Sequence, residues 1–379
     1  MSGAAAAQRR VAFGAIADDD RGKRAAIDAA VARVLDRGWF VLGEEVRAFE
    51  EAFAKFLGVP HVVGCGNGTE AIALALQATG LSRGDEVVLP ANTCGPTLAG
   101  VRLAGGQPRL ADVDPETLTL DARNAERACT PATKFLLPVH LYGGLADVAG
   151  LAALARRRNL KLVEDCAQSH GALLDGRAAG SFGTAAAFSF YPSKNLGAYG
   201  DGGAVATNDA SLASRLRELR QYGWTRRDFA ESEGWNSRLD ELQAAILSAK
   251  LPFLAAENAR RREIAERYDA AFDGLPLRRL ASRRGSVSSR HIYPVRLERR
   301  DAFREHLLAR GVETGIHYPF PLHLQPAYAF LGNRKGDFPV SEAACETLVS
   351  LPIHPSLSDA HADAVIAATR SFFDTGAHR

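Results

Sequence analysis

One lysine of this chain lies in surroundings that a surface lysine does not need. Residues 188–203 read FSFYPSKNLGAYGDGG, so Lys194 follows an apolar, strand-like run and precedes four closely spaced glycines. Lysine is the side chain whose pKa falls readily on burial and whose neutral amine forms a Schiff base with a carbonyl compound. The residue type therefore indicates carbonyl chemistry. A lysine in a turn is nevertheless far more often structural or exposed to solvent, so other motifs must decide between these interpretations.

A glycine-rich turn earlier in the chain is typical of a phosphate site. Residues 64–76 read GCGNGTEAIALAL, in which the turn leads directly into an apolar helix. Backbone N–H groups and the helix dipole at such a start favour an anion. A dinucleotide-binding fold has a similar turn but requires an acidic residue at the end of the next strand, whereas Glu86 precedes the strand EVVLP. A phosphate cradle is therefore favoured over a dinucleotide site and over a purely structural turn.

A carboxylate ends a third apolar segment. In residues 160–171, LKLVEDCAQSHG, Asp165 lies at the carboxyl end of the expected strand, the edge of an open α/β sheet where ligands bind. A partly buried carboxylate there is unfavourable without a cationic partner, and a protonated ring nitrogen is one such partner. The alternative is a helix N-cap aspartate. Gln168, three residues later, is either a capping-box partner or a second polar contact to the same ligand.

The three motifs together match the requirements of one cofactor. In chain order they offer an anion cradle, a carboxylate and an amine. Pyridoxal 5′-phosphate (PLP) needs a site for its phosphate, a counter-charge for its pyridine nitrogen and an amine for its aldehyde. Each motif alone is common, whereas all three in this order and on these elements indicate a PLP enzyme.

The elements that must position these residues indicate an α/β fold. Short, continuously apolar strands alternate with amphipathic helical stretches, which is the pattern of a mainly parallel sheet covered on both faces. A chain of 379 residues is expected to form two domains. Pro252 interrupts a long helical stretch and predicts a kink or break there. We place the boundary at this point, with a large PLP-binding domain over 1–250, including the N-terminal segment, and a smaller C-terminal α/β domain over 251–379.

Composition argues against several other classes of protein. The 46 basic and 44 acidic side chains give a net charge of +2 and are spread along the chain, so neither a nucleic-acid surface nor an acidic tail is expected. No apolar run reaches the roughly 20 residues of a membrane span, and the N-terminal stretch lacks the apolar core of an export signal. The five scattered cysteines favour a reducing compartment over a disulfide framework or a zinc site. We therefore expect a cytoplasmic protein with a small-molecule ligand.

Five motifs, in order along the chain, carry a resemblance to a known family. They are GNGTEAIALAL, VEDCAQSHGA, FSFYPSKNLGAYGDGG, WNSRLDELQAA and IHYPFPLHLQPAY. With them the chain resembles the DegT/DnrJ/EryC1/StrS family of sugar aminotransferases from about Gly38 to Phe373. This family is part of the fold-type-I, aspartate aminotransferase-like group of PLP enzymes. The resemblance implies a large domain with a mainly parallel, seven-stranded-type sheet covered by helices, and a smaller C-terminal α/β domain.

The resemblance also implies roles for individual residues. Lys194 would carry the Schiff base, Asp165 would pair with the pyridine nitrogen, and Gln168 would contact the cofactor's 3-hydroxyl group. The cofactor's phosphate would be held by Gly68, Thr69 and Ser189. Asn236 would reach the phosphate of the neighbouring subunit's cofactor, which implies an obligate homodimer with shared active sites.

One position departs from the family pattern. Many members place an aromatic side chain over the cofactor ring where this chain has Cys94. We assign Cys94 to the cofactor site and leave the residue that stacks on the ring open.

The side chains expected near the sugar or its phosphates are Tyr191, His317, Tyr318 and His323. Loop packing is the alternative for the two histidines. A metal site built from them is not expected, because their loop supplies no thiolate or acidic neighbour to complete it.

The implied reaction transfers an amino group from an amino acid, expected to be L-glutamate, to a nucleotide-linked keto-sugar in amino-sugar biosynthesis. The motifs resemble those of members that act on 3-keto sugars more than those that act on 4-keto sugars, so we expect a 3-keto-6-deoxyhexose. Three alternatives stay open: a 4-ketosugar aminotransferase of the same family, a PLP-dependent sugar dehydratase, and a non-catalytic regulator that binds a nucleotide sugar. The retained Lys194 disfavours the dehydratase.

Overall fold

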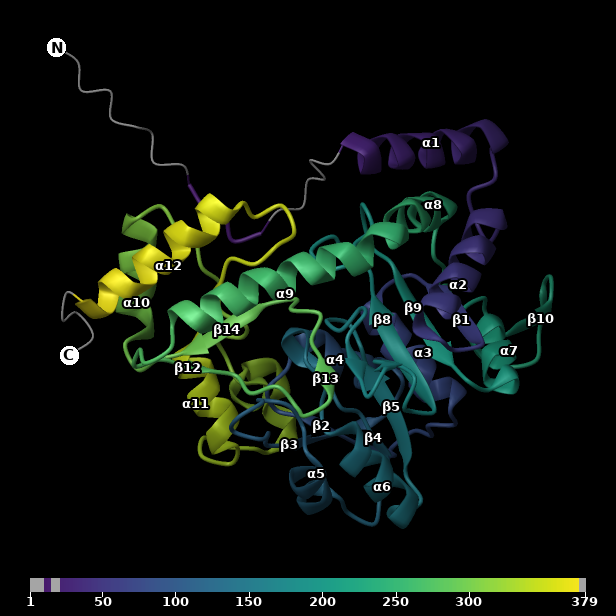
Figure 1. Ribbon diagram of the computed structural model, residues 1–379. Helices are drawn as coiled ribbons and strands as arrows, with labels where there is room; N and C mark the ends of the chain where they lie inside the picture. The colour runs from purple at the N-terminus through teal and green to yellow at the C-terminus, as the bar shows by residue number, and fades with distance from the viewer. Residues whose placement is uncertain (1–9, 15–20, 375–379) are drawn as a thin grey trace.

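A seven-stranded sheet lies at the centre of the fold (Figure 1), in a computed structural model that describes residues 10–14 and 21–374. In spatial order the strands are β1 (His61–Cys65), β9 (Gly203–Thr207), β8 (Ala185–Ser189), β5 (Lys161–Asp165), β4 (Thr133–Leu136), β2 (Glu86–Pro90) and β3 (Gln107–Ala111). Each neighbouring pair from β8 to β3 is parallel, whereas β9 runs antiparallel to the strands on either side of it. The expected mainly parallel sheet is therefore confirmed.

Helices cover both faces of this sheet. Successive residues of a strand point to opposite faces, so Val163 and Leu162 of β5 pack in different cores. One face packs against α3 (Gly68–Ala78), α4 (Gly95–Leu103) and α7 (Ala210–Leu219). The other face packs against α2 (Glu44–Leu57), α5 (Ala122–Ala128), α6 (Val148–Arg158) and α8 (Glu241–Lys250). Burial on both faces explains why the strands read as continuous apolar runs.

A second sheet belongs to the C-terminal part of the chain. Its strands β12 (Arg278–Arg279), β14 (Tyr293–Arg296) and β15 (Leu348–Leu351) pair antiparallel. Helices α9 (Leu254–Ala271), α10 (Arg300–Ala309) and α12 (Asp359–Asp374) share a separate hydrophobic core with it, and these elements lie together in Figure 1. Val11 also packs in this core and pairs with Val312. Residues 10–14 therefore contact the C-terminal unit, although the predicted large domain includes the N-terminal segment.

Pro252 breaks the long helical stretch as expected. Helix α8 ends at Lys250, a 3₁₀ turn η2 spans Leu251–Phe253, and α9 begins at Leu254. Proline has no N–H to donate and its ring clashes with the preceding turn, which accounts for the break. The division into 1–250 and 251–379 stays a prediction, and the separate core around the second sheet supports it.

Shorter or peripheral elements connect these parts. Helix α1 (Arg21–Arg37) lies along α8, where Ala30 and Val34 pack against Ala245. The remaining elements are β6 (Leu173–Leu174), β7 (Arg177–Ala178), β10 (Trp224–Arg226), β11 (Phe229–Ala230), β13 (Ser286–Val287), α11 (Pro339–Thr347), η1 (Leu141–Gly143), η3 (Leu322–Leu324) and η4 (Pro326–Leu331).

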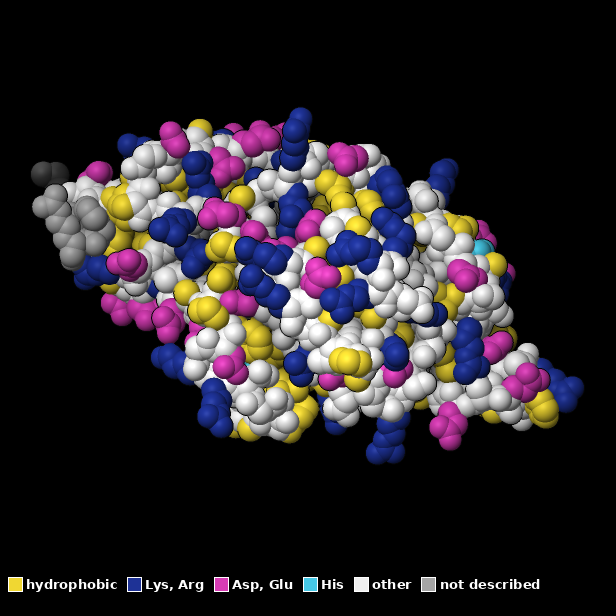
Figure 2. All heavy atoms as spheres, turned by 90° about the horizontal axis from the view of Figure 1, so that it is seen from below, with side chains coloured by type: hydrophobic (Ala, Val, Ile, Leu, Met, Phe, Trp, Pro, Cys, Tyr) yellow, Lys and Arg dark blue, Asp and Glu magenta, His cyan; other side chains and the backbone are white. Residues whose placement is uncertain are grey.

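The surface agrees with the balanced composition. On the face seen from below in Figure 2, basic and acidic side chains are interspersed. Among the described residues, no helix combines the length and the apolar character that crossing a lipid bilayer requires.

A buried carboxylate joins α8 to the start of α2. Glu241 is fully buried, and its two oxygens accept hydrogen bonds from the backbone N–H groups of Gly43 (2.7 Å), Glu45 (3.0 Å) and Val46 (2.9 Å). The first N–H groups of a helix have no partner within the helix, and here a side chain from a distant helix supplies one. A Cβ at Gly43 would lie 2.5 Å from this carboxylate, which explains the glycine.

We predict that Glu241→Gln lowers the free energy of unfolding, because an amide NH₂ would face backbone donors that now meet a carboxylate. The expected loss is about 2 kcal/mol, measured by urea denaturation. Glu44→Gln is the matched control, because Glu44 at the same helix start pairs with Arg37 at the surface and is 65% exposed. An equal loss in both variants would contradict this account.

Candidate active site

A cavity of about 660 Å³ lies where the carboxyl ends of β5 and β8 meet the start of α3. This edge of a parallel sheet is where ligands bind in α/β proteins. The cavity brings together most of the residues that the sequence predicts for the site. These are Gly68, Thr69, Cys94, Asp165, Gln168, Ser189, Tyr191, Lys194, His317 and Tyr318.

The glycine-rich turn presents the first N–H groups of α3 to this cavity. Asn67 caps the helix, with its side-chain oxygen accepting from the N–H of Glu70 at 2.9 Å. The N–H groups of Gly68 and Thr69 stand in the first turn, where no partner exists within the helix. A Cβ at Gly68 would lie 2.5 Å from the Cβ of Ser189, so glycine is required for the turn to reach the end of β8. Two backbone donors and one hydroxyl thus converge on a place suited to a phosphate.

Asp165 is a buried carboxylate at the end of β5. It is 3% exposed and accepts hydrogen bonds from the hydroxyl of Thr97 at 2.8 Å and from the N–H of Ala167 at 3.1 Å. Burial raises the pKa of Asp165, while these two hydrogen bonds and the charge of Lys194 oppose the rise. No basic side chain in the described part of the chain forms an ion pair with it. The carboxylate is therefore suited to a cationic group that enters the cavity.

Lys194 lies in the turn that follows β8. Its backbone N–H donates to the carbonyl of Tyr191 at 2.8 Å. Burial lowers the pKa of the Lys194 amine, while the charge of Asp165 opposes that change. A larger fraction of this amine is consequently neutral at a given pH than for an exposed lysine, and the neutral form is the nucleophile.

Two threonines of the site were missed by the sequence analysis. The hydroxyl of Thr97 donates to Asp165, and the hydroxyl of Thr93 lies 2.9 Å from that of Thr97. Both are buried near the start of α4. The sequence carries no signal for this contact, because the partners are 68 residues apart and threonine is common near helix starts.

Gln168 is fixed by two residues. Its side-chain oxygen accepts from the N–H of Tyr142 at 2.7 Å, and its amide nitrogen donates to the hydroxyl of Tyr318 at 2.9 Å. The thiol of Cys94 lies close to that hydroxyl, and burial raises the pKa of this thiol and of Tyr318. The amide nitrogen of Gln168 has a second N–H, so a contact to a ligand stays open.

His317 and Tyr191 occupy the wall and the mouth of the cavity. The Nδ1 atom of His317 lies 2.9 Å from the hydroxyl of Ser350, and its ring stacks on Phe13 with centroids 5.5 Å apart. Burial, together with the charge of Lys194, lowers the pKa of His317 to about 4. The imidazole is therefore neutral near pH 7. Tyr191 is 55% exposed and lies at the opening.

Two predicted residues do not line this cavity. Asn236 is exposed, and its backbone pairs with Gln221. His323 is 3% exposed, with its Nε2 atom 3.0 Å from a carboxylate oxygen of Glu342 and its ring edge-on to Phe338. The turn η3 directs this histidine toward α11, which corresponds to the loop-packing alternative. Its position in this chain does not support a contact with a sugar.

The buried cluster of His140, Glu164 and Cys166, beside Asp165, has a structural role. Although burial alone would raise the pKa of Glu164, hydrogen bonds from His140 and from the backbone of Gly183 and Gly180 lower it. The Nδ1 atom of His140 accepts from the N–H of Ala146, so its proton is on Nε2, 2.9 Å from Glu164. Cys166 lies close enough to complete a possible ligand set for a metal. The lone pairs of His140 and Glu164 are already engaged, which explains this cluster without an ion.

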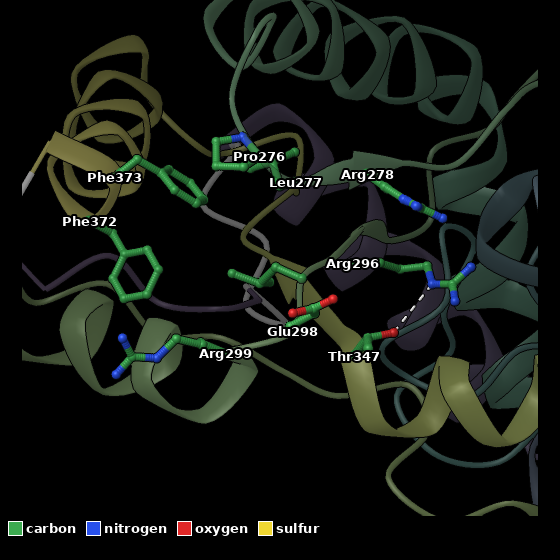
Figure 3. A pocket seen from close by; sticks show the side chains of 10 residues that line it. Pro276, Leu277, Arg278, Arg296, Glu298, Arg299, Thr347, Phe372 and Phe373 are labelled. Carbon is green, nitrogen blue, oxygen red and sulfur yellow. Dashed lines mark hydrogen bonds between the residues drawn. The ribbon is translucent and has the colours of Figure 1, made fainter. Parts of the chain in front are cut away.

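A second hollow lies outside the predicted site (Figure 3). It measures about 550 Å³ and lies among β12, β14 and α12. Its charged side chains are Arg278, Arg296, Glu298 and Arg299, and Arg296 donates to the hydroxyl of Thr347 at 3.3 Å. None of the sequence-predicted site residues lines it, so the chemistry is assigned to the first cavity.

Comparison with known proteins agrees with this geometry. Residues 22–370 match the model of the DegT/DnrJ/EryC1/StrS aminotransferase family. A dTDP-3-amino-3,4,6-trideoxy-alpha-D-glucose transaminase from Streptomyces venezuelae is 45% identical over 350 residues, 92% of either chain. The crystal structure of S. venezuelae DesV in complex with a ketimine intermediate has a TM-score of 0.94 at 44% identity and covers 96% of this chain and 98% of its own. NtdA from Bacillus subtilis, solved with bound cofactor PMP, has a TM-score of 0.89 at 28% identity and covers 97% of this chain and 87% of its own.

We predict that Asp165→Asn lowers the pKa of the Lys194 amine further, because the carboxylate now stabilises the ammonium form. In the cofactor-free protein at pH 8, acetic anhydride should then acetylate Lys194 several-fold faster than in the unchanged chain. Peptide mass spectrometry measures the rate, with exposed Lys55 as the internal reference.

Asp201→Asn is the control, because Asp201 lines the same cavity but is exposed and does not contribute to the Lys194 pKa shift. Slower or unchanged acetylation in Asp165→Asn would contradict the predicted coupling between the two side chains.

Proposed function

The chain belongs to the DegT/DnrJ/EryC1/StrS aminotransferase family, and on this basis we propose that it aminates a nucleotide-linked 3-keto sugar. The amino donor is an amino acid, L-glutamate in this proposal, and the sugar is a 3-keto-6-deoxyhexose. The observation that carries the proposal is the cavity that holds Lys194, Asp165 and the first turn of α3 together. The similarity to the S. venezuelae dTDP-3-amino-3,4,6-trideoxy-alpha-D-glucose transaminase supports C3 as the position of amination.

The enzyme is a PLP-dependent aminotransferase, and its residues fit this cofactor. The turn at Gly68 approaches Ser189 so closely that a Cβ would collide there, which leaves a cradle for a phosphate. Asp165 is a buried carboxylate that no basic side chain of the described residues pairs with, which suits it to a protonated pyridine nitrogen. Lys194 offers an amine whose pKa burial lowers. We propose that the N–H groups of Gly68 and Thr69 and the hydroxyl of Ser189 hold the phosphate.

Asp165 and Lys194 have different roles in the proposed reaction. Bound PLP supplies an aldehyde that reacts with amines and a ring that takes up the electron pair left when a carbon loses its proton. Asp165, held by Thr97, would pair with the ring nitrogen and keep it protonated. Lys194 would hold the aldehyde and, once an amino acid has displaced it, its amine would accept the proton from the α-carbon of the donor. In the second half-reaction the Lys194 ammonium would return a proton to C3 of the sugar.

Other residues of the cavity orient the cofactor and the sugar in this proposal. Gln168 has a free N–H for the 3-hydroxyl group of the cofactor. Cys94 lies at the start of α4, and we propose that its sulfur contacts the ring where relatives have an aromatic side chain. Tyr191, His317 and Tyr318 line the part of the cavity that we assign to the sugar.

The small number of basic side chains in the cavity supports the proposal that a second subunit contributes to the site. Among its lining residues the sole lysine or arginine is Lys194, while both the donor amino acid and the nucleotide sugar are anionic. Asn236, exposed and outside this cavity, is available to a neighbouring copy. We therefore propose a homodimer in which Asn236 reaches the cofactor phosphate of the other subunit. We also propose a cytoplasmic location, in keeping with five cysteines that are all unpaired.

To test this function, nucleotide-linked keto sugars are added to the pyridoxamine phosphate form of the protein. We expect nucleotide-linked 3-keto sugars to restore the visible absorbance of the PLP form at least about tenfold faster than 4-keto isomers. Lys194→Ala should bind PLP yet lose about 100-fold or more of both half-reactions, because it lacks the proton-transfer group.

The alternatives give different results in the same assay. Faster reaction of the 4-keto isomers would favour the 4-ketosugar enzyme. Dehydration of the sugar without amination would favour the dehydratase. Tight binding of nucleotide sugars without any amino transfer would favour the non-catalytic regulator.

Mixing two inactive variants tests the shared site. Lys194→Ala and Asn236→Ala are refolded together, so that about half of the dimers hold one chain of each kind. Such a dimer has one site with both Lys194 and Asn236 intact, and about a quarter of the original activity should return. Refolding each variant alone is the control. Absence of any recovery would contradict the proposal that Asn236 serves the other subunit.

A further inference from the structure

A histidine to which the sequence analysis gave no role lines the active-site cavity. His291 lies between β13 and β14, in the C-terminal part of the chain, and it faces the cavity that contains Lys194. Its Nδ1 atom lies 2.8 Å from the side-chain oxygen of Asn195, the residue that follows Lys194. A residue of the C-terminal part thus touches the turn that presents the amine.

The orientation of Asn195 follows from the groups around it. The side-chain nitrogen of Asn258 lies 2.8 Å from the carbonyl of His170, which can only accept, so the side-chain oxygen of Asn258 is its free acceptor. The side-chain nitrogen of Asn195 donates to that oxygen at 2.7 Å and to the carbonyl of Ser289 at 2.9 Å. The side-chain oxygen of Asn195 is therefore the atom that faces His291.

The protonation state of His291 follows from the orientation of the Asn195 side chain. Because the oxygen of Asn195 has no hydrogen to give, the proton between the two residues is on Nδ1 of His291. Burial, reinforced by the charge of Lys194, lowers the pKa of His291 well below its usual value. The ring is thus neutral, with a proton on Nδ1 and a lone pair on Nε2. Within the described part of the chain no further hydrogen bond of this ring is found.

Asn195 joins three parts of the chain. It is 7% exposed and connects the lysine turn to Asn258 on α9 and to Ser289 in the segment before β14. If His291 lacked a donor at Nδ1, the buried oxygen of Asn195 would lose its partner, and an unpaired buried acceptor is costly. The side chain of Asn195 would then turn or shift, and the adjacent Lys194 would move with it.

We propose that His291 is a positioning residue for the reaction: its Nδ1–H fixes Asn195 and thereby holds the Lys194 amine in place. The inference rests on the proposed role of Lys194 as the cofactor lysine. His291 acts through Asn195 and transfers no proton itself. The neutral ring also leaves an acceptor, Nε2, on the cavity wall without adding a second positive charge beside Lys194.

The direct test is ¹⁵N NMR of the PLP-bound enzyme with labelled histidine at pH 7.5. The proposal predicts that His291 is neutral and protonated on Nδ1, with its signals assigned by their loss in His291→Asn. A ring protonated on Nε2 alone, or on both nitrogens, would overturn it. The spectrum reports this state whether or not the chain aminates a sugar, so its outcome is independent of the proposed function.

Three variants test the consequence for the reaction. His291→Leu should lower kcat about tenfold by misplacing the amine while leaving KM for the nucleotide sugar unchanged. The side-chain nitrogen of asparagine can occupy the Nδ1 position and that of glutamine the Nε2 position. His291→Asn should therefore recover most of the rate lost in His291→Leu, and His291→Gln should not. Equal rates in the Asn and Gln variants, or a loss confined to KM, would contradict the proposal.

Discussion

The site depends on a buried carboxylate that forms no ion pair with a basic side chain among the described residues. Asp165 at the end of β5 is stabilised by one hydroxyl and one backbone N–H, and burial still raises its pKa. A buried carboxylate of this kind is unfavourable in the cofactor-free protein and becomes favourable once a positively charged ring nitrogen binds beside it. The same cavity lowers the pKa of Lys194. One desolvated space thus holds both a carboxylate suited to a cationic ring nitrogen and an amine suited to attack a carbonyl carbon.

The topology of the sheet explains why these groups meet. Parallel strands bring their carboxyl ends to one edge, where β5 supplies Asp165 and the turn after β8 supplies Lys194. The start of α3 reaches the same edge because Gly68 permits contact with Ser189. The C-terminal part then closes the wall with His291, His317 and Tyr318. The cavity is therefore shared between the large sheet's loops and the C-terminal part of the chain, and the hydrogen bonds of Asn195 connect the two.

Residues that lie in a recognisable local pattern could be predicted from the sequence, and those defined by a distant contact could not. Asp165 and Lys194 follow apolar strands, and Pro252 breaks its helix for a reason that is local to the chain. Thr97 and His291 are recognisable only through partners 68 and 96 residues away. His323 lies in the predicted substrate loop, and its turn directs its side chain to Glu342, a contact that the local sequence pattern does not indicate.

The central claim is that Asp165 keeps the ring nitrogen of bound PLP protonated. Its most direct test is ¹⁵N NMR of the enzyme reconstituted with PLP labelled at the pyridine nitrogen. The account predicts a protonated nitrogen at neutral pH in the unchanged chain and an unprotonated one in Asp165→Asn. An unprotonated nitrogen in the unchanged chain, or no difference between the two proteins, would contradict it.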